Sequence, residues 1–217
     1  MFERILIILP VALMILLAAS CTIVPIDPDA ENGAAGSAVL QARDVETYLD
    51  DYWEPYMLPE IHERRVDLAT LIQVASANGW DYAGEMHGEI RGDIGASYTF
   101  IVYCTAVVKE TNTESRNGFI VVEVGDQDSY EVRVSIGPAL SGTAIRDSIR
   151  FVDFNQFVNQ VDFARLATEL NSRGNENALR SADIFSLDGM TIEFTGSFTA
   201  PNGSDVLSVM PIFLEVK

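Results

Sequence analysis

Hydrophobic residues recur with a helical period over residues 44–92 and with a two-residue period after that region. The pattern first predicts a helix over 45–52 and a second helix that Pro59 opens, since proline suits a first helical turn. A third helix begins after Asp67, a good capping residue, and ends at Gly79. Its apolar side chains repeat at helical spacing, at Leu68, Leu71, Ile72 and Ala75. We expect this region to form a helical lead-in packed on the domain that follows.

Alternation of apolar and polar residues predicts strands in the rest of the chain. We expect five of them, at 98–108, 119–124, 130–136, 190–199 and 206–216. Asn117 and Gly118 favour a hairpin turn between the first two strands, and Gly137 with Pro138 ends the third. Pro211 marks an edge or a bulge in the last strand, because proline donates no hydrogen bond to a neighbouring strand.

Helical spacing returns between the third and fourth strands, over 154–161 and again over 163–170. The change of phase at Asp162 predicts a kink or two abutting helices, and Gly174 predicts a helix end. Three strands, a helical segment and two strands is the order of an OB fold. The predicted fold class is therefore α+β, mainly β, with an OB-like five-stranded barrel over 93–217 and a helical segment between strands 3 and 4. The structural alternative is a five-stranded antiparallel sheet with packed helices and no barrel.

The N-terminus carries an apolar run that follows Glu3 and Arg4 and is too short to span a bilayer comfortably. The run ends in Leu-Ala-Ala-Ser-Cys, and small residues before Cys21 resemble the bacterial lipobox. In a lipobox the signal peptide, here residues 1–20, is removed and the cysteine thiol takes a diacylglyceryl group. We therefore expect lipidation of Cys21 and a location at the periplasmic face of a bacterial membrane. The alternative is an ordinary signal peptide with a chance cysteine.

The segment after the cleavage site predicts a tether, because residues 21–43 are rich in proline, glycine and alanine. Thr22 stands where an aspartate signals inner-membrane retention in some envelopes. Sorting to the outer membrane therefore stays open.

The composition is strongly acidic, with 32 Asp and Glu residues, 14 Lys and Arg residues and a net charge of −18. Glu3 and Arg4 cancel, so removal of residues 1–20 leaves this charge unchanged. A charge this negative repels phosphate groups and anionic lipid headgroups. The sequence thus excludes nucleic acid as a partner and assigns membrane attachment to the lipid on Cys21.

Cys104 has no second cysteine for a disulfide once Cys21 carries lipid. It shares the parity of Phe100 in the predicted first strand and has no basic neighbour, so we expect a buried and inert thiol. His62 and His87 are the only histidines, and no cysteine or carboxylate cluster at ligand spacing accompanies both. We expect no metal and no cofactor.

The stretch 141–153 most invites a functional interpretation, because arginines and carboxylates crowd there, and the amides over 155–160 raise the same question. The candidate ligand or partner surface consists of Arg146, Asp147, Arg150, Asp153, Asn155, Gln156 and Asn159. Such groups can hydrogen-bond sugar hydroxyls or the charged rim of a partner protein, and amides four apart would share a helix face. The alternative is a surface network whose members satisfy one another. No nucleophile elbow, phosphate loop or dinucleotide fingerprint occurs, and we expect no enzyme.

Several motifs taken together resemble a known family. They are CTIVPI at 21–26, VDLATL at 66–71, IGP at 136–138, GTAIRD at 142–147 and FNQFVNQ at 154–160. The chain resembles the domain-of-unknown-function family 2291, predicted periplasmic lipoproteins commonly encoded beside sugar ABC transporters. The resemblance implies an OB-like fold and an accessory place in carbohydrate uptake, with a sugar-binding protein or permease as partner, and it carries over no catalytic residues. Tyr103 and Cys104 stand where the family implies a small residue in the first strand.

Three functional hypotheses follow. The first, a non-enzymatic, lipid-anchored accessory protein of carbohydrate uptake, depends on the resemblance. The second, a saccharide-binding module, depends on the ability of OB folds to accept oligosaccharides. The third is a hydrolase that uses acidic residues of the segment 141–153, since carboxylate pairs perform glycoside hydrolysis.

Overall fold

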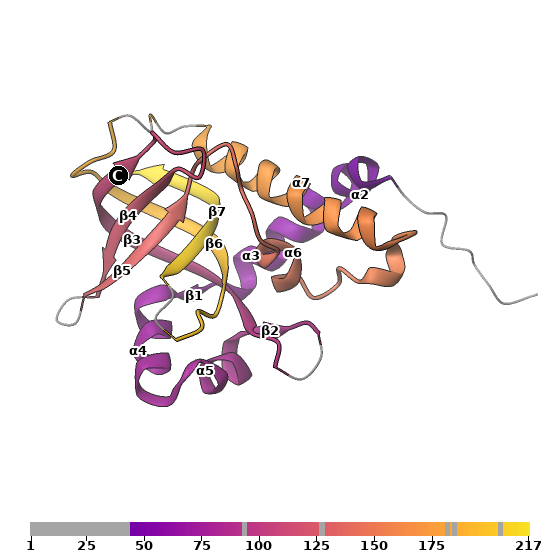
Figure 1. Cartoon of the computed structure of the whole chain (residues 1–217), viewed down its shortest axis with the longest axis horizontal. Helices are drawn as coiled ribbons and strands as arrows, with labels where there is room; N and C mark the ends of the chain where they lie inside the picture. Colours follow the sequence, from indigo (N-terminus) through magenta and orange to yellow (C-terminus); the bar gives the residue numbers. More distant parts are fainter. Residues whose placement is uncertain (1–43, 93–94, 126–128, 181–182, 184–185, 204–205) are drawn as a thin grey trace, which may run out of the picture. The chain divides into compact units, whose positions relative to one another are not determined.

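The computed structural model describes residues 44–92, 95–125, 129–180, 183, 186–203 and 206–217 (Figure 1). The chain divides into two compact units, Met1–Ala38 and Val39–Lys217, and every described residue belongs to the second unit. The predicted signal peptide, the tether and Cys21 lie outside the described residues. No helix within the described ranges is long and apolar enough to cross a membrane.

Helical segments fill the chain before the first long strand. They are α2 (Val45–Tyr52), the π-helical turn η1 (Trp53–Met57), α3 (Leu58–Arg64), α4 (Leu68–Asn78) and α5 (Trp80–His87). The predicted helix over 45–52 is confirmed, and Pro59 lies in the first turn of α3. Asp67 caps α4 as predicted, with its Oδ1 accepting a hydrogen bond of 2.8 Å from the amide of Thr70. Gly79 ends α4 with a φ of 92°, which side chains with a Cβ rarely adopt.

The strands that alternation predicts are present. They are β3 (Tyr98–Asn112), β4 (Phe119–Val124), β5 (Tyr130–Ser135), β6 (Thr191–Thr199) and β7 (Leu207–Val216). Two short strands, β1 (Val66–Asp67) and β2 (Glu89–Ile90), also pair with β3. The sequence pattern missed both, because two residues are too few for a period to show.

Pairing of the long strands returns to the strand where it starts. β3 pairs with β4, β4 with β5, β5 with β7, β7 with β6, and β6 again with β3. β5 and β7 run parallel, with Val132 opposite Leu207, whereas the other four pairs are antiparallel. The wholly antiparallel sheet considered as an alternative is therefore wrong in this pair. We call the five strands β3 to β7 the strand ring.

The helical region between β5 and β6 differs from the prediction. It contains α6 (Ala144–Ser148), the 3-10 turn η2 (Phe154–Gln156) and α7 (Gln160–Leu179). The helix expected over 154–161 is wrong, because Phe157 is extended and Asn159 begins α7 by capping it. The kink expected at Asp162 is wrong too, since that residue lies in the first turn of α7.

Gly174 does not end α7, and the helix continues to Leu179. A Cβ on Gly174 would lie 2.9 Å from the carbonyl oxygen of Pro211 and 3.1 Å from Cδ1 of Ile145. Glycine therefore lets α7 approach β7 and α6 closely. The sequence pattern misread a packing glycine as a helix stop.

Each face of the sheet carries its own hydrophobic cluster. Side chains from every strand of the ring meet in the first cluster, which also takes Leu68 and Leu71 from α4. The second cluster lies on the opposite face, where Ile101 and Ile212 pack with side chains of α2, α3, α6 and α7. β3 is buried on both faces over residues 99–102, and from Tyr103 to Val108 exposed and buried residues alternate along it.

A bulge in β7 exchanges its two faces at Pro211. The pairing of β6 with β7 shifts register there, and Ile212 is the extra residue. Val209 and Leu214 consequently both face the first cluster, although an odd number of steps separates them. The edge or bulge predicted at Pro211 is thus confirmed as a bulge.

Candidate functional site

Arg146 and Asp147 lie on α6 and bind each other. Nε of Arg146 donates a hydrogen bond of 2.8 Å to Oδ1 of Asp147, and Nη1 donates one of 3.0 Å to the carbonyl oxygen of Phe163. The guanidinium of Arg146 also lies 4.0 Å from the ring centroid of Phe163. These contacts fasten α6 to α7. Both charges of the pair are engaged within the chain.

Arg150 belongs to a second ionic network, which joins α3, β2 and the segment after α6. Its side chain pairs with Glu89, and that hydrogen bond raises the pKa of the Arg150 guanidinium. Glu89 also accepts from Arg64 at 2.6 Å, and Arg64 pairs with Glu60 at 2.8 Å. The backbone amide of Arg150 donates to Glu60 at 2.8 Å. The network therefore holds three segments together that are distant in sequence.

The carboxylate and amides of 153–159 stabilise the starts of two helical segments. Asp153 accepts hydrogen bonds of 2.8 and 2.7 Å from the backbone and side-chain nitrogens of Asn155, and Gln156 accepts one of 2.9 Å from the amide of Asp153. Asn159 caps α7, since its Oδ1 accepts hydrogen bonds of 2.8 Å from the amide of Val161 and 3.0 Å from the amide of Asp162. The shared helix face expected for these amides is wrong, because η2 and α7 are separate segments.

A small open pocket gathers three of the predicted surface residues. Arg146, Asp147 and Asp153 line it together with Arg91 and Phe163. Its lining does not include the other four residues, which are Arg150, Asn155, Gln156 and Asn159. Contacts within the chain thus occupy the polar groups of the predicted surface, and its role toward a ligand or partner stays a prediction.

A larger pocket, of about 560 Å³, lies against the outer face of the strand ring. We call it the β4–β5 pocket. Phe119 on β4 and Arg133 and Ser135 on β5 form its floor, alternating with residues such as Ile120 and Val134 that face the first hydrophobic cluster. Loop and strand residues complete the lining, among them Ser115, Asn117, Ser141, Thr143, Thr199, Asn202, Ser208 and Met210.

The segment after β5 forms one wall of the β4–β5 pocket, and a close approach of two glycines fixes it. A Cβ on Gly137 would lie 2.2 Å from the nitrogen of Gly118, so only glycine fits. The amides of Ile136 and Gly137 donate to the carbonyl of Gly118 at 2.9 and 3.0 Å. Further along the wall, the buried side chain of Asn171 on α7 donates a hydrogen bond of 3.0 Å to the carbonyl oxygen of Gly142. The wall is therefore attached to both the β3–β4 turn and α7.

The pocket lining is chemically distinctive. Among the described residues it combines hydroxyl and amide side chains with one aromatic ring, Phe119, and one charged side chain, Arg133. The guanidinium of Arg133 lies 4.5 Å from the centroid of the Phe119 ring. Sequence analysis missed this site, although the outward parity of Phe119, Arg133 and Ser135 on two paired strands was the available signal.

The cysteine and the histidines are the remaining residues with candidate chemistry. Cys104 is 4% exposed, and burial, followed by the Asp67 charge, raises the pKa of its thiol to about 12. The predicted burial of Cys104 is confirmed. The strand face that carries Cys104 is packed, although Tyr103 and Cys104 depart from the small residue that the family implies there.

His62 lines a separate pocket with Arg65, Glu193 and Glu215. Within the described ranges no three His, Cys, Asp or Glu side chains gather as a metal site.

One solved structure gives the fold a precedent. An OB-fold protein from Thermotoga maritima aligns with a TM-score of 0.63 at 17% identity, covering 82% of this chain and all of the other. At this identity the likeness shows the fold alone, a mixed α/β arrangement of sheet and helices. No curated protein matches the sequence.

A family model described as a predicted periplasmic lipoprotein, DUF2291, matches residues 11–215. The match spans nearly the whole chain, including every described helix and all but the end of β7. It confirms the resemblance that the motifs indicated, together with the predicted periplasmic location of a lipoprotein. This chain therefore belongs to the DUF2291 family of predicted periplasmic lipoproteins.

Proposed function

We propose that this protein is a lipid-anchored, non-catalytic saccharide-binding module that assists carbohydrate uptake. The observation that carries the proposal is the position of the β4–β5 pocket. OB folds bind oligosaccharides on the face of their second and third strands and between two loops beside it. In order along the strand ring, β4 and β5 are the second and third strands, and they supply the floor of the pocket.

The two loops also correspond. Ser115 and Asn117 come from the connection between the first and second strands of the ring. Pro201 and Asn202 come from the connection between the fourth and fifth strands. The strand ring is, in this proposal, an OB-like barrel whose binding face is the β4–β5 pocket.

The lining fits a saccharide better than a nucleic acid. Serine, threonine and asparagine side chains offer both donors and acceptors to sugar hydroxyls, and the Phe119 ring offers an apolar face to a sugar ring. The net charge of −18 repels a polyanion. The proposal assigns no catalysis, since Asp147 pairs with Arg146 and Asp153 caps η2, which engages the carboxylates that a hydrolase would need.

Anchoring gives the binding module its place in uptake. Lipid on Cys21 and a tether over 21–43 would confine the domain to a layer beside the membrane, where weak contacts become effective through a raised local concentration. A sugar-binding protein or the permease of an ABC transporter is the proposed partner, through the surface that includes Arg146 and Asp153. Thr22 allows the anchor to be in the outer membrane.

Calorimetry of the full chain, extracted from membranes in detergent, against a panel of sugars tests the proposal. We expect at least one sugar to bind, and we expect Ser208→Trp to abolish that binding by filling the pocket from β7. Val107→Trp is the matched control, because Val107 is 46% exposed on β3 and does not line the pocket. Absence of heat for every sugar, or unchanged binding to Ser208→Trp, would contradict the proposal.

A further inference from the structure

We infer that the ligand of the β4–β5 pocket is an anionic saccharide, a sugar that carries a carboxylate or phosphate, and that Arg133 binds its charge. This inference rests on the proposed saccharide binding and adds the chemical class of the sugar. It derives from the charge of the pocket, which differs from the charge of the protein around it.

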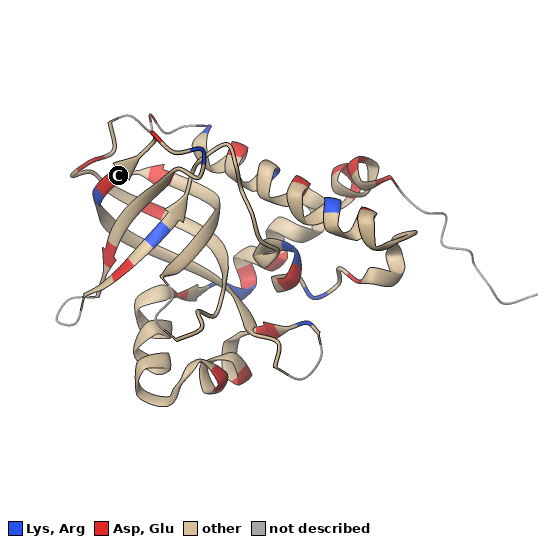
Figure 2. Ribbon diagram, in the orientation of Figure 1, with Lys and Arg blue, Asp and Glu red and all other residues tan. Residues whose placement is uncertain are grey.

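Among the described residues, the lining of the β4–β5 pocket contains no acidic side chain, although the protein is strongly acidic. Asp and Glu number 32 in the sequence, and Figure 2 shows them spread over helices and strands alike. Within the described ranges, none of them lines the β4–β5 pocket, and Arg133 is the one charged residue of that lining. A neutral sugar needs no such exclusion, because acidic side chains accept hydrogen bonds from sugar hydroxyls well. A pocket lining without carboxylates favours a negatively charged ligand, because no like charge repels it.

Arg133 differs in its contacts from the five described arginines that pair with a carboxylate. Each of these five forms an ion pair with an aspartate or glutamate; they are Arg64, Arg146, Arg150, Arg165 and Arg173. Within the described part of the chain, Arg133 makes no ion pair, and its buried Nε has no hydrogen-bond partner. A buried donor without a partner costs free energy that a ligand oxygen could offset.

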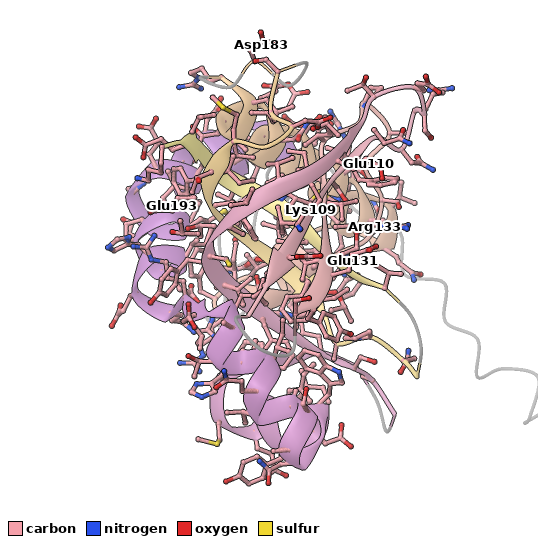
Figure 3. All side chains as sticks on the ribbon, turned by 90° about the vertical axis from the view of Figure 1, so that its left-hand side faces the viewer. Lys109, Glu110, Glu131, Arg133, Asp183 and Glu193 are labelled. Carbon is pink, nitrogen blue, oxygen red and sulfur yellow. The ribbon has the colours of Figure 1, made fainter. Side chains whose placement is uncertain are left out.

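The neighbours of Arg133 hold it without neutralising it. Figure 3 shows Arg133, Glu131 and Lys109 on the outside of the strand ring. Lys109 pairs with Glu123 at 2.9 Å, and Glu131 forms no ion pair with Arg133 among the described residues. The Phe119 ring covers one face of the guanidinium, and the edge that donates hydrogen bonds is the part that binds carboxylate or phosphate.

Hydroxyl groups stand beside this cation in the strand register. Arg133 lies opposite Ser208 of β7, and Ser135 lies opposite Phe119 of β4. The hydroxyl oxygens of Ser135 and Ser208 are 3.5 Å apart. A ligand with an acidic group at Arg133 therefore meets hydroxyl partners on two adjacent strands, as a hydroxylated anion requires.

Pairs of sugars that differ in one acidic group test the inference. The full chain in detergent is titrated with galacturonate against galactose and with glucose 6-phosphate against glucose. We expect at least one acid to bind about tenfold or more tightly than its neutral counterpart, with an affinity that falls as salt is added. The carboxylate and phosphate arms distinguish the two sources of charge.

Two variants assign the preference to Arg133. Arg133→Gln should remove the preference for the acid and leave the neutral sugar bound as before. Arg65→Gln is the matched control, because Arg65 also stacks on an aromatic ring, 5.1 Å from the centroid of Tyr103, but lines another pocket. Thermal melting of each variant confirms that it is folded.

The outcomes separate this inference from the proposed function. Equal binding of acids and neutral sugars, or a preference that survives Arg133→Gln, overturns the anionic ligand and leaves saccharide binding standing. Absence of heat with every sugar overturns both. Binding of acids alone that Arg133→Gln abolishes and Arg65→Gln preserves supports both.

Discussion

Cys104 shows how far its surroundings can change a side chain's chemistry. Its thiol lies in the first hydrophobic cluster on β3, and burial is the larger cause of its raised pKa, with the Asp67 charge second. A thiolate is the reactive form of cysteine, so a thiol that stays protonated at neutral pH is inert.

The same environment predicts a pH dependence of stability. The pKa of the Cys104 thiol rises from 9.0 to about 12 on folding, so between these values the unfolded chain binds fewer protons than the folded one. We expect the free energy of unfolding to fall as the pH rises through this range. Urea unfolding at several pH values measures it, and Cys104→Ala should show a shallower fall because it lacks the titrating group. Identical slopes for both proteins would contradict the prediction.

The candidate surface illustrates what residue types in a sequence leave undecided. Asp153 and Asn159 have the side chains that would bind a sugar, and the same oxygens cap η2 and α7. The sequence alone could not decide between helix capping and sugar binding, because both use the same side-chain oxygens as hydrogen-bond acceptors. The β4–β5 pocket was missed for another reason: its lining comes from segments that only the tertiary fold brings together.

At the scale of elements, the packing of α7 shows how one position can matter. Gly174 stands in the middle of the helix, where alanine would normally be favoured by about 1 kcal/mol. The opposing effect is steric, because a Cβ at this position meets the carbonyl oxygen of Pro211 at 2.9 Å. Overpacking of this kind costs about 1–3 kcal/mol, which exceeds the gain in helix propensity.

We therefore expect Gly174→Ala to lower the free energy of unfolding by up to about 2 kcal/mol. Ser172→Ala is the matched control, since Ser172 is exposed in the same helix and gains propensity without a clash. Chemical denaturation of the two variants and the parent chain decides the question. A Gly174→Ala protein as stable as the Ser172→Ala protein would show that β7 yields to the added methyl group.

Secondary structure was largely readable at this scale, including the bounds of α2, α4 and β4, and the region between β5 and β6 was not. The long strands and α2 follow from hydrophobic period, and the bulge follows from Pro211. The expected helix over 154–161 failed because apolar side chains at helical spacing there belong to η2, an extended residue and the start of α7. The spacing of apolar residues indicates which side chains are buried, but over a short stretch it does not determine the backbone conformation.

For the whole molecule, we propose that one of the two cysteines carries the attachment to the membrane. Cys21 follows the small residues of the lipobox-like sequence, and Cys104 is buried in the folded domain. The family of predicted periplasmic lipoproteins agrees with an anchor at the N-terminus. The helices of the described residues offer no membrane span.

Mass spectrometry of the intact protein from membranes tests the anchor. The native chain should begin at Cys21 and carry the added mass of acyl groups, because several chains on one residue anchor securely. Cys21→Ser should retain residues 1–20 and lack acyl mass, whereas Cys104→Ser should resemble the native protein. A native protein with residues 1–20 attached and an unmodified Cys21 would refute lipidation.

The position of β7 in the ring has a consequence for biogenesis. β7 follows the other four strands in sequence, yet it lies between β5 and β6 and pairs with both. The contacts that complete the sheet join residues as distant as Val132 and Leu207, so they form late and slowly. A chain from which β7 has not yet been delivered therefore lacks the strand that joins β5 to β6, and folding of the sheet has to wait for the C-terminal segment.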